Sequence, residues 1–271
     1  MVVAALVVAV AGISVTLQST SEPTLVEVSG PDVSTQPTTT TTTAEPTTTT
    51  STTVKAPTTS STSTTVAAPA EPVDGTLRRG DRGAEVLALQ RQLRALGYWH
   101  GTSDETYGHL TEQAVTAFQK VEGLSPDGVA GPATRAALAE AERPSTSAKG
   151  NLVEVDKGRQ ILFVVRDGKV AWTLNVSTGT ERPYSVNGRT ELADTPPGRW
   201  TVDWAVDGVD VGELGALYRP RYFHGDGIAV HGYHSVPNYP ASHGCVRVTE
   251  AAMDWLWAQN LMPMGSAVWV H

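Results

Sequence analysis

The stretch HGYHSVPNYPASHGCVRV, residues 231–248, contains the only cysteine of the chain, Cys245, and three of its seven histidines. The run GIAVHGY predicts a strand that ends at His231, and TEAAMDWLWAQN predicts a helix capped by Thr249. A loop with two prolines separates the two elements. Three alternatives follow for the thiol: a nucleophile, a metal ligand, or a small buried apolar residue.

The neighbours of Cys245 favour the nucleophile. A thiol reacts as the thiolate and needs a base or a cation beside it, and a loop that returns Cys245 to His231 supplies a base. Gly244 permits unusual backbone angles, and N–H groups around Cys245 could bind an oxyanion. If this segment is a strand, Arg247 faces the same way as Cys245 and could hold a substrate carboxylate.

A metal site would use His231, His234, His243 and Cys245, which form a tetrahedral donor set. His243 and Cys245 are two positions apart and can share a strand face, whereas His231 and His234 are three apart and cannot. We therefore rank the metal below the nucleophile, interpret His234 as a loop residue and expect no cofactor. A merely buried thiol is favoured less because the cysteine is flanked by His-Gly and followed by an arginine.

Composition limits the class of partner. The chain of 271 residues carries a formal net charge of −8, and its 20 lysines and arginines form no basic runs. Such a chain is not expected to bind nucleic acid. A single cysteine also excludes an internal disulfide.

The N-terminal region predicts export. Residues 1–20 begin with the apolar run MVVAALVVAVAGISVTL, which suits a signal peptide or an N-terminal membrane anchor. Residues 21–75 are rich in Thr, Pro and Ser and are predicted to be a disordered stalk, because they lack the apolar surface to fold. An extracytoplasmic location in the cell envelope follows, with cleavage and membrane anchorage both left open.

Residues 76–142 show helical periodicity. Apolar residues recur every three or four positions over 86–96 and again over 110–121, and Pro132 opens a third, shorter pattern. We expect a compact three-helix domain, followed by a linker at 143–150.

Residues 151–271 change to the pattern of strands. Short β-branched and apolar runs alternate with turns, including the hairpin signal Asp167-Gly168. TPPGRWTVDWAV predicts a rigid turn with another strand, and SAVWV predicts a final strand. The expected fold is mainly β, sandwich or barrel-like, with one late helix.

The helical region resembles a known domain. LRRGDRGAEVLALQRQLRALGY and AVTAFQKVEGLSPDGVAGPATRAAL are similar to the small peptidoglycan-binding domain of cell-wall enzymes, over about residues 76–140. The resemblance implies peptidoglycan as the partner. Tyr98, Trp99 and Tyr107 could stack on a ligand or pack at the edge of the domain, and the residues alone leave this open.

The second resemblance covers residues 151–271. His-Gly, a loop and then Ser-His-Gly-Cys-Val-Arg is similar to the signature of YkuD-type L,D-transpeptidases, which cross-link bacterial cell walls. It implies that Cys245 is the nucleophile and that His231 is the proton donor and acceptor.

The same resemblance implies roles for the remaining motif positions. His243 and Gly244 would shape the site, with backbone N–H groups nearby forming the oxyanion hole. Ser242 and Arg247 would lie in the substrate-binding part, and Arg247 stands where other members have Asn.

The implied reaction joins two peptidoglycan stems. A tetrapeptide stem would form a Cys thioester with the enzyme, and a second stem would accept it to give a 3→3 cross-link. The same motif is compatible with L,D-carboxypeptidase activity or with D-amino-acid exchange, because only the acceptor differs. A non-catalytic wall-binding protein is a further alternative, which the intact motif disfavours.

Overall fold

The structure, a computed structural model, describes residues 75–271. The predictions for 1–20, and for all but the last residue of the 21–75 stalk, lie outside the described residues. Within the described range, no helix is long and apolar enough to cross a membrane.

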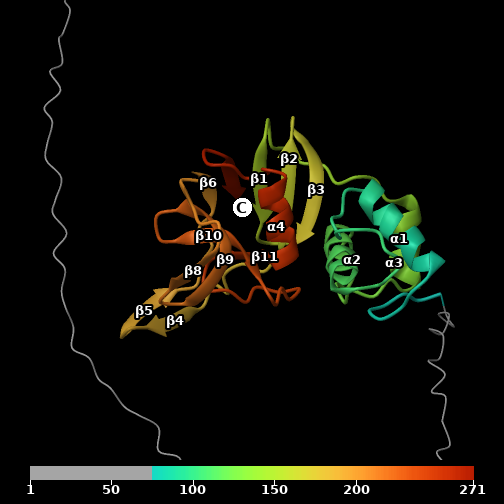
Figure 1. The fold of residues 1–271 in the computed structure, drawn as a ribbon, viewed down its shortest axis with the longest axis horizontal. Coiled ribbons are helices and arrows are strands. Elements are labelled where there is room, and N and C mark those ends of the chain that lie inside the picture. Colours follow the sequence, from blue (N-terminus) through green and yellow to red (C-terminus); the bar gives the residue numbers. More distant parts are fainter. Residues whose placement is uncertain (1–74) are drawn as a thin grey trace, which may run out of the picture. The chain divides into compact units, whose positions relative to one another are not determined.

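Three helices form the first folded region, as the periodicity predicted (Figure 1). They are α1 (Ala84–Ala95), α2 (His109–Val121) and α3 (Pro132–Glu140). Pro132 occupies the first turn of α3, where its missing N–H costs nothing. Each helix contributes apolar side chains to a shared core.

Two of the three aromatic residues considered for ligand stacking belong to this core. Tyr98 is fully buried and packs edge-on against Phe118, with ring centroids 5.4 Å apart. Tyr107 is also buried, and its hydroxyl donates to the carbonyl of Gly128 at 2.7 Å. Trp99 lies 5.2 Å from the ring of Trp255. Core packing therefore replaces the stacking interpretation for both tyrosines.

The second region is mainly β with a late helix, which confirms the predicted class. One sheet has the strand order β3-β2-β1-β12-β6; the other runs β11-β10-β9-β7, with β8 also paired to β9, and β4 pairs with β5 alone. The sheets of residues 151–271 are open and do not close into a barrel. The strands are β1 (Leu152–Asp156), β2 (Ile161–Arg166), β3 (Lys169–Asn175), β4 (Pro183–Val186), β5 (Arg189–Leu192), β6 (Gly198–Thr201), β7 (Trp204–Ala205), β8 (Val209–Gly212), β9 (Gly215–His224), β10 (Ile228–Tyr233), β11 (Val246–Thr249) and β12 (Ala267–Val270), and the helix is α4 (Glu250–Ala258).

Strand β2 is buried on both faces because each face of its sheet is covered. Leu162 and Val164 point into the core between the two sheets. Ile161 and Phe163 point the other way, into the core shared with the helical region. This double burial explains why residues 161–165 read as an uninterrupted apolar run.

Strands β10 and β11 run parallel at the edge of the second sheet and are followed by α4. Val230 and Val246 point into the core, so the residues that alternate with them point to the opposite face. The prediction that the strand ends at His231 was wrong: β10 continues to Tyr233, because its pairing with β11 extends to Thr249. Thr249 caps α4 as predicted, accepting from the N–H of Ala252 at 3.1 Å.

Two hairpins were not anticipated from the sequence. Strands β4 and β5 form one, turning at Asn187 and Gly188 with φ of 48° and 74°. Strands β8 and β9 form the other. Asn-Gly is the residue pair that a tight turn with two positive φ angles prefers, so the first hairpin had a readable signal.

Candidate active site

The pairing of β10 with β11 brings the predicted pair together. His231 is the register partner of Arg247, and Cys245 comes directly before β11. Partners on parallel strands, and residues two apart on one strand, share a face of the sheet. Cys245, His231 and Arg247 accordingly line one cavity of about 200 Å³.

His231 is buried, with 2% of its surface exposed, and its Nδ1 lies 2.9 Å from the carbonyl oxygen of Gly232. A carbonyl can only accept, so Nδ1 carries the hydrogen and Nε2 keeps the lone pair of a base. Burial lowers the pKa of His231 to about 4; the bond to Gly232 opposes this shift and the charge of Arg247 adds to it. The ring is therefore neutral at neutral pH.

Cys245 is half-buried, and its thiol donates to the carbonyl oxygen of Gly227 at a sulfur–oxygen distance of 3.7 Å. Burial raises the pKa of the thiol, while the N–H of Ala229 and the charge of Arg247 act in the opposite direction. With the imidazole neutral as well, the resting pair is a neutral thiol beside a neutral base.

Arg247 is held in place but not fully satisfied. Its Nη1 donates to the carbonyl of Ala241 at 3.0 Å, and its guanidinium lies 4.2 Å from the centre of the Tyr233 ring. Its Nε is buried and has no hydrogen-bond partner within the part of the chain that the structure describes. Arg247 lines the same cavity as Cys245, and a guanidinium there suits a carboxylate.

Ser242 and Gly244 build the turn before Cys245. The Ser242 hydroxyl donates to the Cys245 carbonyl at 2.6 Å and accepts from the Gly244 N–H at 3.0 Å. Gly244 has a φ of 146°, and a Cβ there would lie 2.7 Å from the carbonyl oxygen of Asp194. In this conformation the Ser242 hydroxyl and the Gly244 N–H are engaged within the turn, so their direct effect is on its shape.

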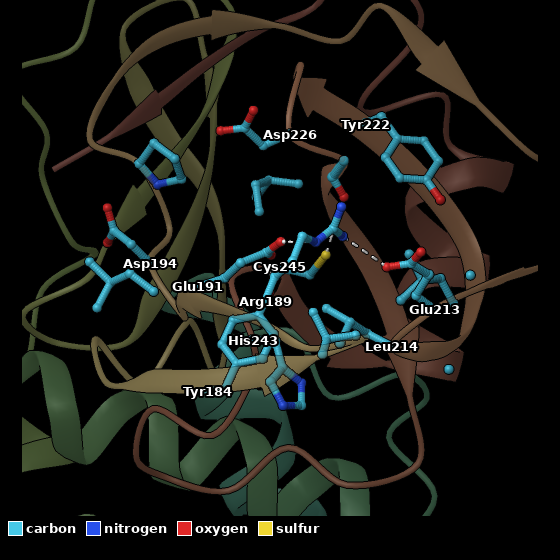
Figure 2. A pocket seen from close by; sticks show the side chains of 18 of the residues that line it. Tyr184, Arg189, Glu191, Asp194, Glu213, Leu214, Tyr222, Asp226, His243 and Cys245 are labelled. Atoms are coloured by element: carbon cyan, nitrogen blue, oxygen red, sulfur yellow. Dashed lines mark hydrogen bonds and ion pairs between the residues drawn. The ribbon is translucent and has the colours of Figure 1, made fainter.

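His243 is exposed at the rim, with its ring 4.7 Å from that of Tyr184 on β4. It lies in a larger cavity of about 800 Å³ that also reaches Cys245 (Figure 2). The side chains labelled in Figure 2 surround the Cys245 sulfur, and Arg189 pairs there with Glu191 at 3.3 Å and Glu213 at 3.2 Å. The carboxylates that line this cavity are Glu191, Asp194, Asp210, Glu213 and Asp226.

Sequence reasoning missed these cavity residues, because they come from hairpins far from the cysteine motif. Tyr184 and Arg189 belong to β4 and β5, and Glu213 lies in the turn between β8 and β9. The Asn-Gly turn at 187–188 marked the first hairpin, but nothing local indicated that it lies over Cys245.

The donor set considered for a metal is dispersed. His231 is buried on β10, whereas His234 is exposed beyond the end of that strand, with its ring against Tyr233 at 4.3 Å. In residues 75–271, no group of three or more His, Cys, Asp or Glu side chains is arranged to hold a metal ion.

Comparison with known proteins assigns both regions. The family model of the L,D-transpeptidase catalytic domain, YkuD, matches residues 150–270, and that of a peptidoglycan binding domain matches residues 82–138. A crystal structure of the L,D-transpeptidase from Xylanimonas cellulosilytica is 47% identical, with a TM-score of 0.71, and the match covers 74% of this chain and 100% of that chain.

Curated relatives match over shorter segments. The N-acetylmuramoyl-L-alanine amidase CwlL of Bacillus licheniformis is 41% identical over 80 residues, which is 27% of this chain and 22% of the amidase. A spore cortex-lytic enzyme of Bacillus cereus is 33% identical over 82 residues, which is 30% of this chain and 32% of that enzyme. The chain thus spans about a third or less of these relatives. On the family models and the 47% identity over the whole of that solved chain, the chain belongs to the YkuD family of L,D-transpeptidases and carries a peptidoglycan-binding domain ahead of the catalytic domain.

Proposed function

We propose that the chain is a peptidoglycan L,D-transpeptidase that forms 3→3 cross-links through a thioester on Cys245. The observation that carries the proposal is the shared face of β10 and β11, where His231 with a free Nε2 and Arg247 line the same cavity as the only thiol. Nucleophile, base and carboxylate binder are the groups that acyl transfer from a peptide stem requires.

In the first half-reaction, the Cys245 sulfur attacks the carbonyl carbon of the third stem residue. The thiol proton passes to Nε2 of His231 and a carbon–sulfur bond forms. Backbone N–H groups around Cys245 stabilise the oxyanion. The carbon–nitrogen bond to the terminal D-Ala then breaks, and His231 returns the proton to the departing amine, leaving the thioester.

In the second half-reaction, the side-chain amine of another stem's third residue attacks the thioester carbonyl. His231 takes a proton from this amine and delivers it to the Cys245 sulfur as the carbon–sulfur bond breaks. The products are one new amide bond and the free thiol, so the enzyme is unchanged. Five carboxylates and one guanidinium line the larger cavity, which favours an acceptor that arrives as an ammonium ion. The ammonium group first releases one proton to solvent, and the neutral amine then attacks as described.

The helical domain would hold the enzyme on its polymer, in an extracytoplasmic location at the cell wall. The match of residues 82–138 to a peptidoglycan binding domain supports this part of the proposal.

The decisive test is mass spectrometry of the products from purified disaccharide-tetrapeptide, with wild type beside Cys245→Ala and His231→Ala. We expect a cross-linked dimer with the wild type and none with either variant. A tripeptide alone would indicate a carboxypeptidase, and incorporation of an added D-amino acid would indicate exchange.

A second measurement separates a slow enzyme from a binding protein. Intact mass after incubation with a carbapenem should increase in the wild type and not in Cys245→Ala. If neither product nor adduct forms while sacculus binding persists, the chain acts as a non-catalytic wall-binding protein.

A further inference from the structure

The helical domain is joined to the catalytic domain by more than the linker at 143–150. Main-chain bonds run from the N–H of Trp99 to the carbonyl of Thr173 at 3.1 Å, and from the N–H of Thr173 to the carbonyl of Gly97 at 2.7 Å. They add a strand-like segment at the edge of β3. Phe118 of α2 and Phe163 of β2 belong to one buried cluster, so the two domains share a core.

One face of α2 makes polar contacts across the interface between the helical domain and the catalytic domain. Gln113 and Lys120 are seven positions apart and therefore point the same way from the helix. Both contact Asn175, which is 4% exposed: Asn175 Nδ2 donates to Gln113 Oε1 at 2.7 Å, and Lys120 Nζ donates to Asn175 Oδ1. Burial lowers the pKa of Lys120 to about 7.

The network ends on the loop that joins His231 to Cys245. The carbonyl of Val236 accepts from Gln113 Nε2 and from Asn175 Nδ2, both at 3.2 Å, and Val236 itself is 3% exposed. A second contact follows two residues later, where Asn238 Nδ2 donates to the carbonyl of Pro126 at 2.6 Å. Pro126 lies in the loop between α2 and α3.

The other half of the same loop is held by the catalytic domain. The Ser177 hydroxyl donates to the carbonyl of Tyr239 at 2.8 Å. The N–H groups of Ala241 and Ser242 both donate to the carbonyl of Thr178, at 3.1 and 3.0 Å. The loop between the base and the nucleophile is thus held by the helical domain at its first half and by the catalytic domain at its second.

We propose that the helical domain, besides binding wall polymer, positions the catalytic loop. Gln113 of α2 holds the Val236 carbonyl directly and through Asn175 of β3, and the carbonyl of Pro126 holds Asn238. Contacts at Val236 and Asn238 fix two points of the loop between His231 and Cys245. Each remaining segment is shorter than the whole loop, so the loop can adopt fewer conformations. Because the loop leads directly to Cys245, its conformation decides where the sulfur lies relative to Nε2 of His231, and small misplacements there are costly in rate. The catalytic consequence rests on the function proposed above, whereas the effect on the loop does not.

Two isosteric substitutions in the full chain test this. Gln113→Glu and Asn238→Asp each replace an NH₂ donor with a carboxylate oxygen that faces a carbonyl, at almost constant volume. The matched control is Gln92→Glu on α1, because Gln92 Nε2 donates to the carbonyl of Leu138 at 2.7 Å within the helical domain. Four quantities are measured: hydrogen exchange of the loop amides, the saturating rate and half-saturating concentration of carbapenem acylation, sacculus binding and thermal stability.

We expect both variants to exchange the amides of residues 235–239 faster than wild type. We also expect the saturating acylation rate to fall about fivefold, as for loss of one or two hydrogen bonds, with the half-saturating concentration and sacculus binding little changed. Gln92→Glu should lower thermal stability by a similar amount while leaving loop exchange and acylation as in wild type.

Unchanged loop exchange together with an unchanged acylation rate would overturn the inference, as would a Gln92→Glu control that behaves like Gln113→Glu. If the loop loosens in both variants but wild type itself is never acylated, the positioning role stands and the proposed transpeptidase function fails.

Discussion

His231 and Arg247 are register partners on adjacent parallel strands, so a permanently charged guanidinium lies beside the imidazole that would act as the base. Burial lowers the pKa of His231 first, and the charge of Arg247 adds to that effect. The same charge favours the Cys245 thiolate. Burial therefore keeps the imidazole neutral, and the charge of Arg247 reinforces that effect and makes the thiol easier to ionise.

Replacing Arg247 with Met should weaken binding of the tetrapeptide stem and alter the titration of His231. We expect KM for a tetrapeptide stem to rise about 10- to 100-fold, because a hydrogen bond to a charged group is lost. The pKa of His231 should move upward from about 4, because a nearby positive charge is removed. Steady-state kinetics and an NMR titration of the His231 ring check both effects. Arg91→Met, on the exposed side of α1, is the control, and an unchanged KM would refute the substrate-binding role.

The reactivity of Cys245 should increase steadily from pH 7 to pH 9. Burial raises the pKa of the thiol, so the thiolate is scarce at neutral pH and grows throughout this range. The rate of alkylation by iodoacetamide, followed by intact mass with Cys245→Ser as the blank, measures this directly. A rate that has already levelled off below pH 7 would instead indicate a preformed thiolate–imidazolium pair.

The stability of the fold should decline in acid because of His231. Its pKa is lowered from 6.5 to about 4 in the folded chain, so between these values the native state binds fewer protons than the unfolded state. The free energy of unfolding then rises with pH from 4 to 6.5, by up to ~3 kcal/mol, and is lost as pH falls through that window.

Urea unfolding at a series of pH values measures this slope. His231→Gln should remove most of it, whereas His234→Gln, at an exposed position three residues away, should retain it. Equal slopes in wild type and His231→Gln would assign the acid sensitivity to other groups.

Gly244→Ala should damage the site through the backbone. The residue has a φ of 146°, and a Cβ would lie 2.7 Å from both the Asp194 carbonyl oxygen and the Cδ1 of Ile228. We expect a loss of about 1–3 kcal/mol in unfolding free energy together with slower acylation. Chemical denaturation measures the first and intact mass the second. Gly208→Ala is the control, because a Cβ there meets nothing within 4 Å; equal losses in both would argue against a special role for Gly244.

Much of the fold was predictable because its signals are local. The spacing of apolar residues predicted the three helices, the pair Asp167-Gly168 predicted a hairpin, and Thr249 was predicted as the cap of α4. The end of β10 was placed too early, because pairing with β11 rather than composition decides where that strand stops. The two hairpins over the larger cavity were missed, since exposed strands such as Arg189–Leu192 have no buried face to produce an alternating pattern.

The sequence by itself pointed to Cys245 as the candidate nucleophile and His231 as the candidate base, through the residues around the single cysteine and their resemblance to the L,D-transpeptidase signature. Only the tertiary structure decided what surrounds them. Parallel pairing set His231 beside Arg247, and burial made the imidazole neutral. Asn175 reaches the carbonyl of Val236 across 61 positions of sequence. Periodicity reflects short-range backbone geometry, whereas register, burial and pKa depend on segments that meet only when the chain folds.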